Sequence, residues 1–336
     1  MARVGVDSNR DLVQGYHSRY SVYSLHGPFL FVGALVLSGL IGLALTKPVA
    51  AETTPSDVFA EAVRIEKEVE LIREHLGITA VKPVTQTRTK FLPRHSWQIG
   101  YLILVKVNIF RRQMGLPFLT PNNLNPVLEL EPSAVYEQTQ RILTELRLVK
   151  RRLKITREIP PQEVEADKKP ADVVNKLLFV SAQMDMLNQD KFTANDAFTE
   201  VKRLNEDVGL LLDHLKIQDV AFPPAPKPDA TPSDSLISAF ALLAEVQRLQ
   251  QLASIARVDF GPFRKTTAVE PEDVFNVVIL ILAELQTVKA FLGLEDELTP
   301  PSRNNRDKSP SDVNQLLGYA TNRLRLIQSL QRGAQL

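Results

Sequence analysis

The sequence predicts an all-α fold in which a four-helix module occurs twice in tandem, after an N-terminal hydrophobic segment. The first observation is a ladder of apolar residues at +3, +7, +10, +14, +17 and +21 from each of eight starting positions. Of these 48 positions 42 are apolar, whereas the 44% hydrophobic content of the chain would give about 21. The eight starts are Pro55, Pro93, Pro132, Pro170, Ala194, Pro232, Pro271 and Pro310.

The spacing of these starts is the second observation. The last four lie 139, 139, 139 and 140 residues after the first four, which predicts a tandem duplication with modules at 52–190 and 191–336. Steps of four and three residues form a heptad-like register. Each helix of about 20–22 residues therefore presents an apolar stripe to its neighbours.

The chain begins with a segment that predicts contact with a membrane. Residues 29–45 carry no charge and would span about 26 Å as a helix. Val49 and Ala51 fit a signal-peptidase site, so residues 1–28 and 29–51 would be the n-region and remainder of a cleaved signal peptide. Alternatively, residues 1–28 are cytoplasmic and the hydrophobic segment is an uncleaved anchor in the inner membrane. Both readings predict an extracytoplasmic (periplasmic or secreted) location for residues 52–336.

Each predicted helix has start and stop signals. Proline opens seven of the eight, where its missing N–H costs no hydrogen bond. Acidic residues such as Asp57 follow in the first turn, close to the positive end of the helix dipole. The ends are marked by Gly77, Gly115 and Gly293, and Lys154 and Lys216 take the place of this glycine in the third and fifth helices.

Most connections between helices are long and rich in proline. About 16 residues separate neighbouring helices, for example 78–92 and 217–231. A helix of 22 residues is about 33 Å long, and 16 extended residues reach about 50 Å. Such a linker can run back along the bundle, so both parallel and antiparallel neighbours are open. The short junction at 188–195 predicts a turn between antiparallel helices or a nearly continuous rod.

Composition and motifs exclude several kinds of chemistry. The chain has no cysteine, which removes disulfides and thiolate sites, and its net charge of +1 provides no field for nucleic acid. It contains no Gly-rich phosphate loop, no Gly-x-Ser-x-Gly turn and no His-Glu-x-x-His helix. We therefore expect a protein that is not an enzyme and that binds no cofactor, metal or nucleic acid.

Two repeated polar features accompany the apolar ladder. His75 and His214 occupy matching places and are interpreted as cations near the negative end of a helix. An acid recurs at +13 of the odd-numbered helices, where we expect an edge salt bridge or hydrogen bond that steers helix pairing rather than a catalytic or metal site. These acids are Glu68, Glu145, Asp207 and Glu284.

The densest basic run lies at the end of the third helix and supplies the weak interaction candidates. It would suit an anionic lipid, a polysaccharide or the acidic face of a partner protein. The alternative interpretation is complementation of the helix dipole by solvated side chains. The run comprises Arg147, Lys150, Arg151, Arg152, Lys154 and Arg157.

These observations predict a non-catalytic scaffold or protein-interaction protein of the cell envelope, with a protein partner. Two similar modules would raise avidity by binding two copies of that partner. The alternative is a sensor that binds a small molecule or lipid in a pocket between helices. The runs 101–105 and 277–283, apolar beyond the stripe, would line such a pocket. Otherwise these runs belong to the innermost helices and are wholly buried.

Overall fold

The computed structural model describes residues 52–79, 91–117, 119, 130–188, 192–294, 296–297 and 305–333. These residues form eight α-helices and a short 3-10 turn, with no strand among them, so the predicted all-α fold is confirmed. Every predicted start is the first residue of a helix. The predicted N-terminal segments, 1–28 and 29–51, lie outside the described residues. The elements are α1 (Pro55–His75), α2 (Pro93–Gln113), α3 (Pro132–Arg152), α4 (Pro170–Leu187), α5 (Ala194–His214), α6 (Pro232–Leu252), η1 (Gly261–Phe263), α7 (Pro271–Phe291) and α8 (Pro310–Gly333).

Local hydrogen bonds explain where the helices begin. At the start of α1, the Thr54 N–H donates to Asp57 Oδ2 at 2.7 Å, which satisfies a backbone donor that the helix itself leaves unpaired. In α2 the same role falls to a histidine, because His95 Nδ1 accepts the Leu92 N–H at 3.0 Å. Asp172, Asp196, Asp234, Asp273 and Asp312 repeat the aspartate contact in α4, α5, α6, α7 and α8.

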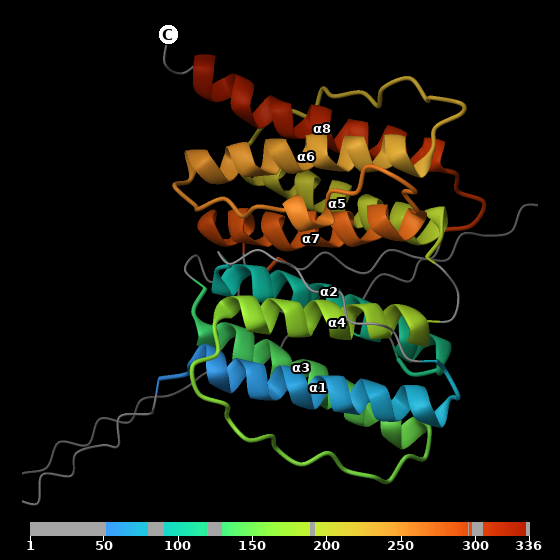
Figure 1. The fold of residues 1–336 in the computed structure, drawn as a ribbon. Coiled ribbons are helices and arrows are strands. Elements are labelled where there is room, and N and C mark those ends of the chain that lie inside the picture. Colours follow the sequence, from blue (N-terminus) through green and yellow to red (C-terminus); the bar gives the residue numbers. More distant parts are fainter. Residues whose placement is uncertain are drawn as a thin grey trace, which may run out of the picture. The chain divides into compact units, whose positions relative to one another are not determined.

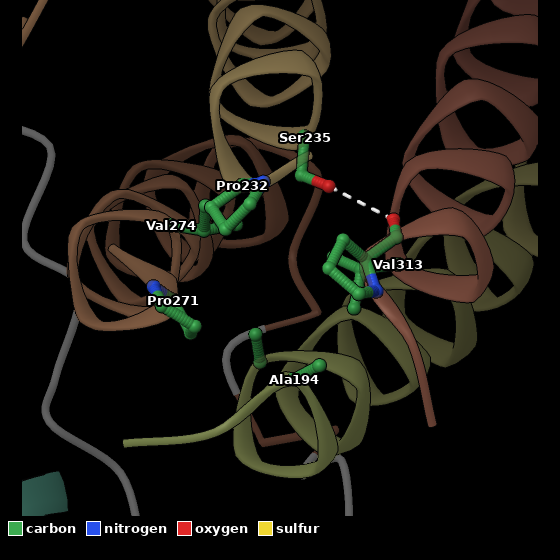
Figure 2. Close-up of a pocket in the computed structure, with 8 residues that line it drawn as sticks. Ala194, Pro232, Ser235, Pro271, Val274 and Val313 are labelled. Carbon is green, nitrogen blue, oxygen red and sulfur yellow. Dashed lines mark hydrogen bonds between the residues drawn. The ribbon is translucent and has the colours of Figure 1, made fainter. Parts of the chain in front are cut away.

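The helices within each half of the chain are parallel. The first turns of α5, α6, α7 and α8 meet around one small apolar hollow, where Ser235 Oγ donates to the carbonyl of Pro310 at 2.9 Å (Figure 2). The first turns of α1, α2, α3 and α4 meet in the same way. Of the two arrangements that the sequence leaves open, the structure has the parallel one.

Both halves have the same order of helices. In the first half α4 and α3 each pack against both α1 and α2, so the order around the bundle is α1, α4, α2, α3. In the second half the order is α5, α8, α6, α7 (Figure 1). Consecutive helices such as α1 and α2, or α5 and α6, are therefore diagonal partners, and the described linker between α5 and α6 passes over α8.

Two of the described linkers, 155–169 and 217–231, run back along the outside of the bundles, because parallel helices require such a connection to return the length of a helix. Residues 155–169 follow α1, where Arg64 Nε donates to the carbonyl of Ile159 at 3.3 Å. Near the other end, Ser56 Oγ accepts the N–H of Lys168 at 3.1 Å. Residues 217–231 follow α8 in a similar way.

The two halves are joined through α2 and α7, which run in opposite directions. Arg94, the second residue of α2, is paired with Glu284, the fourteenth residue of α7, and Lys106, the fourteenth residue of α2, lies near Glu272, the second residue of α7. Since α4 is parallel to α2 and α5 is parallel to α7, α5 runs opposite to α4. The antiparallel directions of α4 and α5 exclude the nearly continuous rod that was the second predicted alternative. Residues 51–336 form one compact unit. Independent folding of residues 52–190 stays a prediction.

The contact between α2 and α7 explains their unusual hydrophobicity. Leu102 and Val105 of α2 are buried, whereas the matching residues of α6, Ala241 and Ala244, are exposed. Among the described helices, α7 is long and apolar enough to cross a membrane, but most of it is buried inside the protein. The interpretation of these runs as innermost helices is confirmed.

The helix ends confirm the unusual role expected for two lysines. Lys154 and Lys216 adopt φ values of 60° and 57°, close to the 69–72° of the three glycines that end α1, α2 and α7. Ser254 takes the same conformation after α6, at φ 57°. Only glycine adopts this left-handed region without a steric cost.

Replacing Lys216 by glycine should therefore stabilise the protein. We expect Lys216→Gly to raise the free energy of unfolding by about 0.5–1 kcal/mol, measured by urea denaturation. The matched control is Lys202→Gly, at an exposed site inside α5, which should lower it by about 1 kcal/mol. Destabilisation by both substitutions would contradict the assignment of strain to residue 216.

Candidate functional site

The structure separates the basic run into a buried residue and surface residues. Lys150 is 2% exposed; its Nζ lies 2.7 Å from Glu68 Oε2 and donates to the carbonyl of Arg157 at 2.7 Å. A lysine held in this way cannot contact a lipid or polysaccharide. Lys150 therefore belongs to the core rather than to an interaction surface.

The other basic residues lie at or near the surface around the C-terminal end of α3. Arg151, Arg152, Lys154 and Arg157 are exposed, and Arg147 is half-buried. Arg152 Nε donates to the carbonyl of Met114 at 3.0 Å, at the end of the neighbouring α2. This contact is the dipole complementation expected for a cation at a helix C-terminus. The exposed members still form a local positive surface.

The repeated acids at +13 make the predicted salt bridges, but in the core rather than at the edge. Three of their four cationic partners recur at +18 of α2, α3 and α7, five turns from each start, a spacing that sequence reasoning missed although it is visible in the sequence. Burial makes these contacts matter, because a buried charge without its partner is costly. The pairs are Glu68–Lys150 at 2.7 Å, Asp207–Lys289 at 2.8 Å, Glu145–Arg111, and Glu284–Arg94 at 2.6 Å.

The Glu284 pair is different because it joins the two halves. At the +18 position of α6 the second half has the neutral Gln250, where the first half has Arg111. Gln250 donates a hydrogen bond to Glu284, but the positive charge that pairs with Glu284 comes from Arg94 in the first half. Arg94 Nε and Nη2 lie 3.0 and 2.6 Å from the two oxygens of Glu284, and Gln98 also donates to this carboxylate. Burial raises the pKa of Glu284, and Arg94 opposes that rise. The site is a buried salt bridge between α2 and α7 in which Arg94 contacts both carboxylate oxygens of Glu284.

A second charged cluster joins the end of α4 to the start of α7. Lys106 Nζ lies 2.5 Å from Asp185 Oδ1 and donates to Ser181 Oγ at 2.9 Å. Glu272 faces Asp185 across the junction between the halves. Burial and the nearby Asp185 carboxylate raise the pKa of Glu272 to about 7, while Lys106 lowers it.

This cluster predicts a pH-dependent stability. A carboxyl whose pKa is raised on folding stabilises the folded state most below its unfolded pKa of about 4.5, and this stabilisation is lost as pH rises through about 7. We expect a loss of about 1–2 kcal/mol between pH 5 and pH 8, less than full linkage because Glu272 is only partly buried. Urea denaturation of Glu272→Gln should lack this loss, whereas the exposed control Glu270→Gln should retain it. Parallel pH profiles for the two variants would contradict the assignment.

The described hollows differ in place and size. The two at the N-terminal ends of the bundles are narrow and apolar. A larger cleft of about 350 Å³ lies on the surface, between α6 and the linker that follows it. Phe240, Phe260, Arg257 and Arg264 line it, and the Arg264 guanidinium stacks 4.6 Å from the Phe240 ring centre. The cleft could accept an anionic or aromatic group.

Within the part of the chain that the structure describes, no three histidine, aspartate or glutamate side chains gather closely enough to hold a metal ion. His75 and His214 are exposed at the C-terminal ends of α1 and α5, as the dipole interpretation expects. Comparison of the chain with protein-family models, with curated proteins and with solved structures found no match.

Proposed function

We propose that this protein is a non-catalytic helical scaffold of the cell envelope that binds a protein partner through its linkers. The observation that carries the proposal is that parallel helices place long connections on the outer surface of the bundles. Most four-helix bundles are antiparallel and are closed with short turns, whereas the parallel arrangement of this protein requires long linkers and so presents more extended chain at the surface. Extended surface segments supported by a rigid core are a common setting for binding.

Among the described residues, the most exposed large apolar side chain lies in one of these linkers. Phe222 is 79% exposed, and Val220 in the same linker is 56% exposed. A phenylalanine that gains little by burial within its own chain is suited to bury itself in a partner. The exposed Arg151 and Arg152, at the C-terminal end of α3, would provide a second contact, to an acidic protein surface or an anionic lipid.

Site-specific photo-crosslinking in the native membrane extract tests this proposal. A photoreactive residue would replace Phe222, Pro161 or Arg257, one in each of three described linkers, and Lys202 or Glu206 on the exposed face of α5 as controls. We expect a discrete protein adduct from at least one linker and none from α5. The absence of protein adducts from all three linkers would contradict the scaffold. N-terminal sequencing of the purified protein would separate a cleaved signal peptide from an anchor.

The alternative is a small-molecule sensor, favoured by the cleft at Phe240 and Arg264. It would bind its ligand between α6 and a linker. A thermal-shift screen against anionic and aromatic metabolites would reveal such a ligand as a rise in melting temperature. Substitution Arg264→Ala should abolish the rise, whereas Arg306→Ala, at an exposed residue in another linker, should not.

A further inference from the structure

The linker 217–231 is held along α8 by a row of side chains. Asn322 Nδ2 donates to the carbonyl of Phe222 at 3.2 Å, and Gln315 Nε2 donates to the carbonyl of Pro224 at 3.0 Å. Ser311 Oγ donates to the carbonyl of Lys227. The three donors occur at intervals of four and seven residues, which places them on one face of the helix.

These contacts hold the linker in an extended course along α8. From Ser311 to Asn322 the helix advances eleven residues, about 16.5 Å at 1.5 Å per residue. Five residue steps of the linker, from Phe222 to Lys227, correspond to this length, an average of about 3.3 Å per step. The Gln315 contact divides the length unevenly, about 10.5 Å for two steps and about 6 Å for three, so the side chains of α8 bridge part of the distance. The average rise is close to the ~3.1 Å of a polyproline II helix. Three prolines, at 223, 224 and 226, favour the same conformation. The segment ends at a turn, where the Ala230 N–H donates to the carbonyl of Lys227 at 3.1 Å.

The extended segment has an inner and an outer edge. Pro224 is half-buried against α8 at Gly318, where a β-carbon would lie 2.7 Å from its ring. Pro223 and Pro226 are exposed; they are three residues apart, one turn of polyproline II, and so project from the same edge. The exposed Phe222 precedes them, and the Lys227 side chain, paired with Asp234 at 2.7 Å, is 57% exposed.

The sequence features that support this arrangement are not repeated in the first half of the chain. The matching linker of the first half, 78–92, has the same length but one proline, Pro83. The residues of α4 that match Ser311, Gly318 and Asn322 are Ala171, Leu178 and Ala182, and Asn175 matches Gln315. Helix α4 therefore lacks two of the three donors, and a leucine side chain occupies the place where Gly318 leaves room for a proline ring.

We propose that residues 222–227 are a pre-ordered polyproline II ligand for a partner domain with an aromatic-lined groove. The exposed rings of Pro223 and Pro226 would pack between the aromatic side chains of that groove, and Phe222 would fill an adjoining apolar pocket. Because α8 already holds the segment extended, binding loses little conformational entropy. The inference rests on the proposed scaffold function and names the class of its partner.

The test uses the full chain in detergent, applied to an array of purified domains of the classes that bind polyproline II segments. We expect at least one domain to bind, and Pro223→Ala/Pro226→Ala to weaken that binding at least about tenfold. The matched control is Pro160→Ala/Pro161→Ala, two exposed prolines in the linker 155–169, which should leave binding unchanged. Equal melting temperatures of the two variants would show that both are folded.

The outcomes distinguish this inference from the scaffold proposal. Binding by no domain of the array, or equal binding by both double variants, overturns the polyproline II ligand. If protein adducts still form at residues 161 or 257 in the crosslinking experiment, the scaffold stands without it. If adducts form nowhere on the linkers, both proposals fail.

Discussion

Arg94→Ala should destabilise the protein by about 3–5 kcal/mol, because it leaves the Glu284 carboxylate buried without a cation. Gln98 and Gln250 would still donate to the carboxylate, but neutral amides compensate a buried charge only in part. Urea denaturation at pH 7 would measure the change. Since burial raises the pKa of Glu284 and Arg94 opposes that rise, the variant should bind a proton more readily. The loss should therefore be smaller at pH 5 than at pH 8.

Two further variants make this result specific. Arg94→Ala/Glu284→Gln should recover much of the stability, because no isolated charge is left in the core. Arg248→Ala should cost less than about 1 kcal/mol, because Arg248 is 50% exposed and its partner Glu245 also contacts Arg325. If Arg94→Ala and Arg248→Ala had equal effects, the salt bridge between α2 and α7 would not behave as a buried one.

Residues 52–190, expressed without the second half, should fold into a helical bundle that associates with itself. The four helices keep all their contacts within this half, but the face of α2 that α7 covers becomes exposed. Leu102 and Val105 are 1% and 8% exposed in the whole protein and lie outside the apolar ladder. Light scattering coupled to size exclusion should report dimers or larger species, since a contiguous apolar patch favours association.

Two sets of substitutions in α2 test whether this apolar face causes the association. Leu102→Ala/Val105→Ala gives α2 the residues that α6 exposes at matching places, Ala241 and Ala244, and should shift the fragment toward monomer. Ile103→Ala, on the ladder and completely buried, should instead cost about 2–5 kcal/mol without reducing association. A fragment without cooperative unfolding would contradict the division at residues 190 and 191.

Contacts between distant residues limited what could be predicted about the candidate site. The alternation of apolar residues shows that Glu68 and Lys150 lie beside a stripe, but not that one is the partner of the other. For this reason the sequence places Lys150 among the residues that could bind a partner. The same limit applies to Gln250, whose matching residue Arg111 gives no hint that Arg94 of the other half would take its place. The sequence identifies Phe222 and the prolines after it as part of a linker, but the hydrogen bonds from α8 that hold this linker in place appear only in the structure.

The sequence by itself determined the secondary structure of this protein: eight helices, their first residues and most of their ends. These features depend on interactions within a few residues, such as Asp57 with Thr54 and the left-handed turn at Lys216. Tertiary structure alone decided that the helices of each half are parallel, that α2 packs on α7, and which charges are paired. An apolar stripe favours burial against any suitable neighbour, so direction and partner follow only from the packing of all helices together.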